Sequence, residues 1–149
     1  MLKLSDPLAQ IIILGFICFC CPGMFNAVGG TGSYGLDPKD SDVGNIAGTT
    51  LSVIFALSSL FAGALFNYMG HRILLIFGGL SYALYIGSFL AYQYIHSVAF
   101  VVISSCLLGI GAGWLWCAQG AVMMGYPEEG EKGKYFSIFW AIFNCGGVF

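Results

Sequence analysis

The sequence predicts an all-α membrane protein, a polytopic bundle of helices that crosses the bilayer several times. Of its 149 residues, 58% are hydrophobic and only 8% are charged, whereas a soluble domain carries about a quarter charged residues. The few charges lie between long apolar runs, and a spanning helix needs roughly 20 successive apolar residues. Composition and spacing together exclude a soluble globular domain and make the lipid bilayer the expected partner.

Four apolar runs are long enough to cross the membrane, and none of them contains Asp, Glu, Lys or Arg. A fifth run has about 14 apolar residues, which is too short to span. We therefore expect about four complete helices and the start of a fifth that is cut off. The expected helices are 7–28, 46–66, 73–94, 97–125 and 135–149.

The first run also fits a secretory signal peptide, but its apolar stretch is long and no small-x-small cleavage site follows it. A spanning helix is the favoured interpretation. Basic residues in short loops mark the cytoplasmic side. Lys39 alone falls on one side of the predicted bundle, so the other side, with the N-terminus, is expected to be cytoplasmic. The residues on that other side are Lys3, Arg72, Lys132 and Lys134.

The sequence carries no sign of an enzyme or of a nucleic-acid partner. A net charge of -2 leaves no basic surface for phosphates. Paired carboxylates, a Ser/His/Asp set and an H-E-x-x-H motif are all absent from the sequence. The six cysteines fall inside predicted helices, where packing or lipid contact is expected rather than a metal site or a disulfide framework. No cofactor is expected.

Small residues recur every four positions on two of the predicted helices. Bilayer helices approach closely at such positions, because they gain packing contacts by associating. We expect both stripes to be seams between helices. The stripes include Gly79, Ala83 and Gly87 on the third helix, and Gly109 and Gly113 on the fourth.

Polar and broken positions within the spans are candidates for lining a solute cavity. Pro22 cannot donate to the carbonyl of Cys18, which would then be free to coordinate a solute, or the proline serves only to kink the helix for packing. Asn26 and Gln119 carry amides that need a partner in hydrocarbon. Gln119 shares a helix face with Trp116. These amides contact either neighbouring helices or a ligand.

The loop between the second and third helices resembles the signature of the major facilitator superfamily, G-x-x-x-D-R-x-G-R-R/K. Gly63, Gly70 and Arg72 match it, while Asn67 stands where the family has Asp. The resemblance implies a gating loop at the cytoplasmic ends of these helices. Because Asn67 is uncharged, its hydrogen bonds are worth less than those of a charged residue.

Further stretches resemble the uncoordinated-93-like branch of that superfamily, especially its fungal members. They are residues 21–27, 116–121 and 126–147. The resemblance implies twelve helices in two halves, with the first and fourth helices lining a central cavity. Twelve spans need roughly 400 residues, so residues 1–149 are expected to be an incomplete N-terminal half.

The leading hypothesis is a transporter of an unknown small solute that works by alternating access. It is supported by the signature and by the amides of Asn26 and Gln119. The alternative is a non-transporting membrane partner that regulates or escorts other membrane proteins, as the resemblance also implies. It is supported by the lack of carboxylates within the spans and by Asn67. The chain would act with the remainder of the transporter or with another membrane protein.

Overall fold

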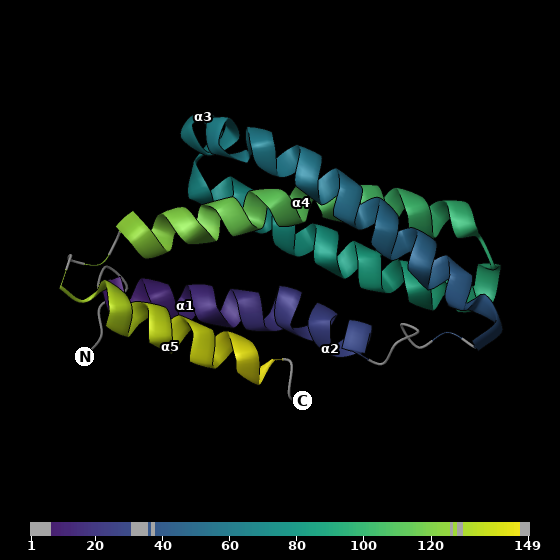
Figure 1. Cartoon of the computed structure of the whole chain (residues 1–149), viewed down its shortest axis with the longest axis horizontal. Coiled ribbons are helices and arrows are strands. Elements are labelled where there is room, and N and C mark those ends of the chain that lie inside the picture. Colours follow the sequence, from purple (N-terminus) through teal and green to yellow (C-terminus); the bar gives the residue numbers. More distant parts are fainter. Residues whose placement is uncertain (1–6, 31–35, 37, 126, 128–129, 147–149) are drawn as a thin grey trace.

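The computed structural model describes residues 7–30, 36, 38–125, 127 and 130–146, and in these residues the chain is a bundle of long helices. Figure 1 shows the helices lying side by side, with the start of α1, the end of α4 and the start of α5 at one end of the bundle. The elements are α1 (Pro7–Cys18), η1 (Phe19–Gly23), α2 (Met24–Gly30), η2 (Pro38–Asp40), α3 (Ser41–Ile95), α4 (Val98–Gly125) and α5 (Lys132–Cys145).

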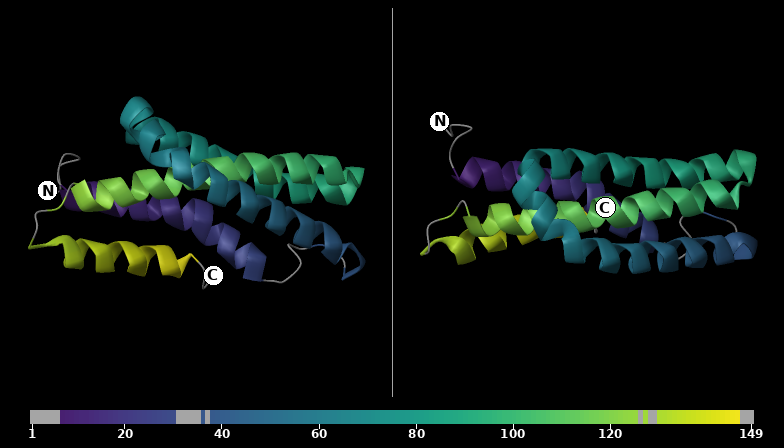
Figure 2. Two further views of the ribbon diagram at one scale, coloured as in Figure 1. Left: turned by 45° about the horizontal axis from the view of Figure 1, so that its top comes forward. Right: turned by 90° about the horizontal axis from the view of Figure 1, so that it is seen from above.

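Three stretches of the described chain are long and apolar enough to cross a membrane: Leu8–Gly30, Ser41–Ile95 and Val98–Gly125. The second is two crossings rather than one, because Gly70 has a φ of 76° and a ψ of 166° and interrupts the 55-residue helix. Figure 2 shows the chain reversing at this point. The predicted helices 46–66 and 73–94 lie on either side of Gly70, so the predicted all-α membrane bundle is confirmed.

The outer surface of the bundle is apolar. Leu60, Phe61 and Ile76 are 77%, 67% and 64% exposed, and a soluble protein would not present such side chains over contiguous patches of its surface. In a bilayer the same side chains contact lipid. The interior is formed by large side chains with essentially no exposure, among them Tyr85, Phe139, Ile11, Leu74, Leu108 and Leu115.

Helix α4 lies against both halves of α3, and glycines allow the close approach. A methyl group on Gly109 would lie 2.8 Å from Ile54 Cβ and 3.0 Å from the Leu51 carbonyl oxygen, before the reversal. A methyl group on Gly78, after the reversal, would lie 2.9 Å from the Gly111 carbonyl oxygen. The sequence Gly109 to Gly113 therefore contacts two helical segments at once.

A side-chain hydrogen bond joins the same two helices. The Ser58 hydroxyl donates to the carbonyl oxygen of Gly109 over 3.0 Å. A methyl group on Gly113 would lie 2.5 Å from the Oγ of Ser58. The structure thus places Gly109 and Gly113 in a seam between α4 and the first half of α3.

The third-helix stripe behaves differently. Ala83 and Gly87 are exposed, and a methyl group on Gly87 would find nothing within 4 Å. The seam of this segment runs through Gly78 and Ser81, which is buried. Of the three residues in the expected stripe, Gly79 faces η1, where a methyl group would lie 3.5 Å from the Cys21 sulfur, and Ala83 and Gly87 lie outside the contact with α4.

Candidate functional site

The first span is interrupted at Pro22 by a π turn, η1, in which Pro22 and Gly23 are buried. A π turn pairs each carbonyl with the amide five residues later, and the Met24 N–H accordingly donates to the Phe19 oxygen. Cys18 is the N-cap of this turn, and its carbonyl oxygen would lie 3.2 Å from a methyl group on Gly23. A helix that widens at a proline can offer that carbonyl the N–H of a later residue, so Pro22 alone does not leave the Cys18 carbonyl free.

The widened part of the first span is closely packed against α5. A methyl group on Gly23 would lie 3.3 Å from the Gly146 Cα, and one on Gly146 would lie 3.0 Å from the Phe19 oxygen. The two backbones therefore contact each other directly where η1 meets the end of α5. A methyl group on Gly15, two turns earlier, would lie 3.3 Å from Ile142. These contacts support the packing interpretation of Pro22.

Gln119 lies inside the bundle and is 7% exposed. Its amide nitrogen donates to the sulfur of Met123, one turn along the same helix. A thioether is a weak acceptor, and this is the only hydrogen bond of Gln119 among the described residues. The buried amide therefore has little of its hydrogen-bonding capacity met by the protein.

Trp116, one turn before Gln119, belongs to an aromatic cluster between α4 and α5. Its ring stacks near Trp140, with centroids 6.5 Å apart, and meets Phe143 edge to face at 5.6 Å. The indole N–H of Trp140 is buried and has no hydrogen-bond partner among the described residues. The cluster places this donor beside the face of α4 that carries Gln119.

Asn26 does not join this group. It is exposed on α2, whereas Gln119 is buried. Leu14 of α1 and Val122 of α4 line the same cavity and so lie at a similar depth in the bundle. Because α1 and α4 run in opposite directions, as Figure 1 shows, Asn26, twelve residues after Leu14, and Gln119, three residues before Val122, lie on the same side of that level. Asn26 is therefore roughly 13 Å from Gln119 along the bundle, at about 1.5 Å per residue. The two amides that the sequence grouped together lie at different depths.

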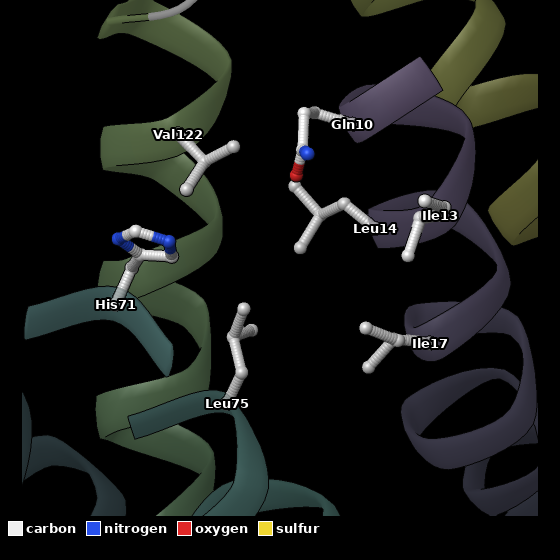
Figure 3. A pocket seen from close by; sticks show the side chains of 7 residues that line it. All are labelled: Gln10, Ile13, Leu14, Ile17, His71, Leu75 and Val122. Atoms are coloured by element: carbon white, nitrogen blue, oxygen red, sulfur yellow. The ribbon is translucent and has the colours of Figure 1, made fainter. Parts of the chain in front are cut away.

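A small cavity that was not predicted from the sequence lies between α1, α3 and α4. It has a volume of about 50 Å³, which is large enough for ordered water but far below the several hundred Å³ of a typical ligand pocket. Gln10 and His71 project from opposite walls, as Figure 3 shows. Its lining is Gln10, Ile13, Leu14, Ile17, His71, Leu75 and Val122.

The predicted gating loop lies at the reversal of α3. Gly70 has a backbone conformation that only glycine adopts easily, which explains why the signature places glycine there. Asn67 and Arg72 are exposed on either side of it. Gly63 has open space around it, with nothing within 4 Å of an added methyl group.

These features define a class: a polytopic helical membrane protein whose second and third spans are joined by a tight glycine turn. The sequence profile of the Major Facilitator Superfamily matches residues 6–149. The chain belongs to this superfamily.

Similar proteins come from plants, fungi and animals. The chain is 46% identical over 146 residues to UNC93-like protein 1 of Arabidopsis thaliana, covering 98% of this chain and 31% of that protein. It is 44% identical over 147 residues to UNC93-like protein C922.05c of Schizosaccharomyces pombe, covering 99% and 29%.

A more distant relative is UNC93-like protein MFSD11 of Xenopus tropicalis, which is 29% identical over 149 residues, covering 97% of this chain and 33% of that protein. The chain thus spans about a third of the length of these relatives. No solved structure matches the chain. The predicted membership of the superfamily and the resemblance to UNC93-like proteins are confirmed.

Proposed function

We propose that the chain forms part of a solute transporter that works by alternating access, and that it has no enzymatic activity. Membership of the superfamily supports this function, as do the four membrane crossings and the glycine turn at Gly70. The chain supplies part of the N-terminal half, and the solute path is completed by parts of the protein outside residues 1–149.

The observation that carries the proposal is the buried amide of Gln119. An amide in hydrocarbon costs several kcal/mol unless it is hydrogen-bonded, and here the protein offers only the sulfur of Met123. Polar groups inside a membrane bundle that are not needed for packing mark solute paths. We assign Gln119, with Trp116 beside it, to contact with the solute. Pro22 shapes the first span, and Asn26 is exposed on α2, away from this site.

The test is uptake by the native gene product reconstituted in liposomes. The liposomes are exposed to a small-molecule extract of the source cells, and the accumulated compounds are identified by mass spectrometry. Wild type is expected to accumulate at least one compound, and Gln119→Leu is expected to lose it. Gln93→Leu is the matched control, because Gln93 is exposed near the end of α3 and should leave uptake unchanged.

Two results would contradict this proposal. Equal uptake by Gln119→Leu and wild type would remove Gln119 from the solute path. Absence of uptake in wild type, together with a membrane protein that co-purifies in fixed ratio, would favour the alternative function of a non-transporting partner that regulates or escorts other membrane proteins.

The same proposal places the N-terminus in the cytoplasm of the cell. The reversal of α3 and the start of α5 lie at the same end of the bundle as the start of α1 (Figure 1), and Arg72, Lys132 and Lys134 belong to these two segments. Lys39 belongs to η2, directly before the start of α3, which lies at the opposite end of the bundle (Figure 1). Lys3 lies outside the described residues. Labelling of cysteines introduced at Arg72 and Lys39 with a membrane-impermeant maleimide tests the orientation: in intact cells only the variant at Lys39 is expected to react.

A further inference from the structure

The aromatic cluster between α4 and α5 is centred on Trp140. The centroid of its ring lies 5.3 Å from that of Phe143 and 5.8 Å from that of Phe139. It lies 5.9 Å from the centroid of Phe136 and 6.5 Å from that of Trp116. Phe139 and Phe143 are buried, whereas both indoles are half-buried and Phe136 is 49% exposed. The outer part of the cluster therefore presents flat ring surface that the rest of the described chain does not cover.

Two hydrogen-bond donors at this cluster lack a good acceptor. The Trp140 indole N–H is buried and has no hydrogen-bond partner among the described residues. The Gln119 amide, one turn from Trp116, donates to the sulfur of Met123, which is a weak acceptor. Buried tryptophan N–H groups ordinarily find a partner, because an unpaired donor in hydrocarbon is costly. A lipid acyl chain over the rings has no acceptor and would leave both donors unmatched.

We propose that Trp140 determines the specificity of the solute site, and that the solute is a neutral molecule with a flat aromatic ring and a hydrogen-bond acceptor. This inference rests on the proposed function, because it uses the site of Gln119 and Trp116. An indole nitrogen can only donate, so it selects an acceptor on the solute, such as a carbonyl oxygen. The exposed ring surface holds the flat part of the solute by stacked or edge-to-face contact.

The charges of the two helices favour a neutral solute. Neither α4 nor residues 135–145 of α5 contain Asp, Glu, Lys or Arg, and a charge inside the membrane is costly without a partner. Aromatic rings attract organic cations, but a cation here would meet the positive end of the Trp140 N–H dipole. A neutral acceptor satisfies that donor and needs no counter-charge from the protein.

The test measures binding rather than transport. The native gene product is placed in lipid nanodiscs, and empty nanodiscs correct for partitioning into lipid. Equilibrium dialysis then compares three flat bicyclic probes: N-methylquinolone has a carbonyl acceptor, naphthalene has no acceptor, and N-methylquinolinium carries a positive charge. We expect saturable binding of N-methylquinolone, and binding of naphthalene that is about 2- to 10-fold weaker, the effect of one hydrogen bond. N-methylquinolinium should bind more weakly than N-methylquinolone.

The decisive variant is Trp140→Phe, which keeps a ring and removes the donor. It should bind N-methylquinolone about 2- to 10-fold more weakly than wild type does, and it should bind naphthalene as wild type does. Trp114→Phe is the matched control. Trp114 is also half-buried on α4, but its ring packs against Phe77 of α3, with centroids 4.9 Å apart, so its replacement should leave binding unchanged. Equal binding of N-methylquinolone by wild type and Trp140→Phe would overturn the proposal, as would tighter binding of N-methylquinolinium.

A second measurement follows the donor itself. The indole N–H signals of wild type are recorded by heteronuclear NMR in the same nanodiscs, and the Trp140 signal is the one that is missing from Trp140→Phe. N-methylquinolone should move this signal downfield, because the N–H gains a carbonyl acceptor, whereas naphthalene should not. An unmoved Trp140 signal at saturating N-methylquinolone would overturn the proposal.

The inference and the proposed function can fail separately. If wild type accumulates no compound in liposomes but binds N-methylquinolone through Trp140, the binding site is supported and the transport function fails. If wild type accumulates a compound and Trp140→Phe accumulates it equally, the transport function is supported and the role of Trp140 is overturned.

Discussion

Replacement of Gly109 by alanine tests how closely α4 packs against α3. The new methyl group would lie 2.8 Å from Ile54 Cβ, 2.9 Å from its Cγ2 and 3.0 Å from the Leu51 carbonyl oxygen. Two of these atoms are a branched Cβ and a backbone oxygen, so neither moves without shifting the helix. Overpacking of this kind costs about 1–3 kcal/mol, and alanine regains up to about 1 kcal/mol of helix propensity. We expect a net loss of about 1–2 kcal/mol.

The control is Gly87→Ala, in the same bundle, where an added methyl group finds nothing within 4 Å. It should be neutral or slightly stabilising for the same reason of helix propensity. The measurement is the free energy of unfolding of the native gene product, from SDS titration in mixed micelles followed by tryptophan fluorescence. If Gly109→Ala were as stable as Gly87→Ala, the close approach of α4 to the first half of α3 would be refuted.

Two further predictions use the same unfolding assay. Gly70→Ala should lower the free energy of unfolding by about 1–3 kcal/mol, because a φ of 76° with a ψ of 166° strains any residue with a side chain. Gly63→Ala is the control, because Gly63 is helical and has open space around it, and it should leave the free energy of unfolding unchanged. Equal effects of the two substitutions would contradict a strained turn at Gly70. Ser58→Ala should lose about 0.6 kcal/mol, the typical worth of a hydrogen bond between membrane helices, since its hydroxyl bonds to Gly109. Ser59→Ala is the control, because the Ser59 hydroxyl donates to the Ala56 carbonyl oxygen within the same helix. If Ser59→Ala lowered the free energy of unfolding as much as Ser58→Ala, the hydrogen bond between helices would be contradicted.

The sequence was sufficient for the number of crossings and for the position of the turn between two of them. The bilayer fixes the length of a spanning helix, so apolar runs alone separate one span from the next. The reversal at Gly70 was predicted although the flanking residues continue the helical pattern on both sides, because Gly70 and Arg72 match a signature that stands between two helices.

Part of the arrangement around the proposed site could be inferred from the sequence. The sequence identified Gln119 and Trp116 as an interior polar and aromatic pair, and the structure buries Gln119 with Trp116 in a cluster beside it. It also grouped Asn26 with them, and the structure leaves Asn26 exposed at another depth. Residue type shows that an amide needs a partner, but depth along the bundle depends on how α1 and α4 are aligned.

By itself, then, the sequence determined that the chain is a helical membrane protein of this superfamily, since hydrophobic length and a short signature are local properties. Only the tertiary structure decided which faces meet. Helical periodicity gives every small residue a face but does not select its neighbour, so the seam runs through Gly78 rather than Gly87. Likewise, only the tertiary structure shows that Gly23, in the π turn, packs directly against Gly146. The sequence could not predict this contact, because the two residues are more than a hundred positions apart in the chain.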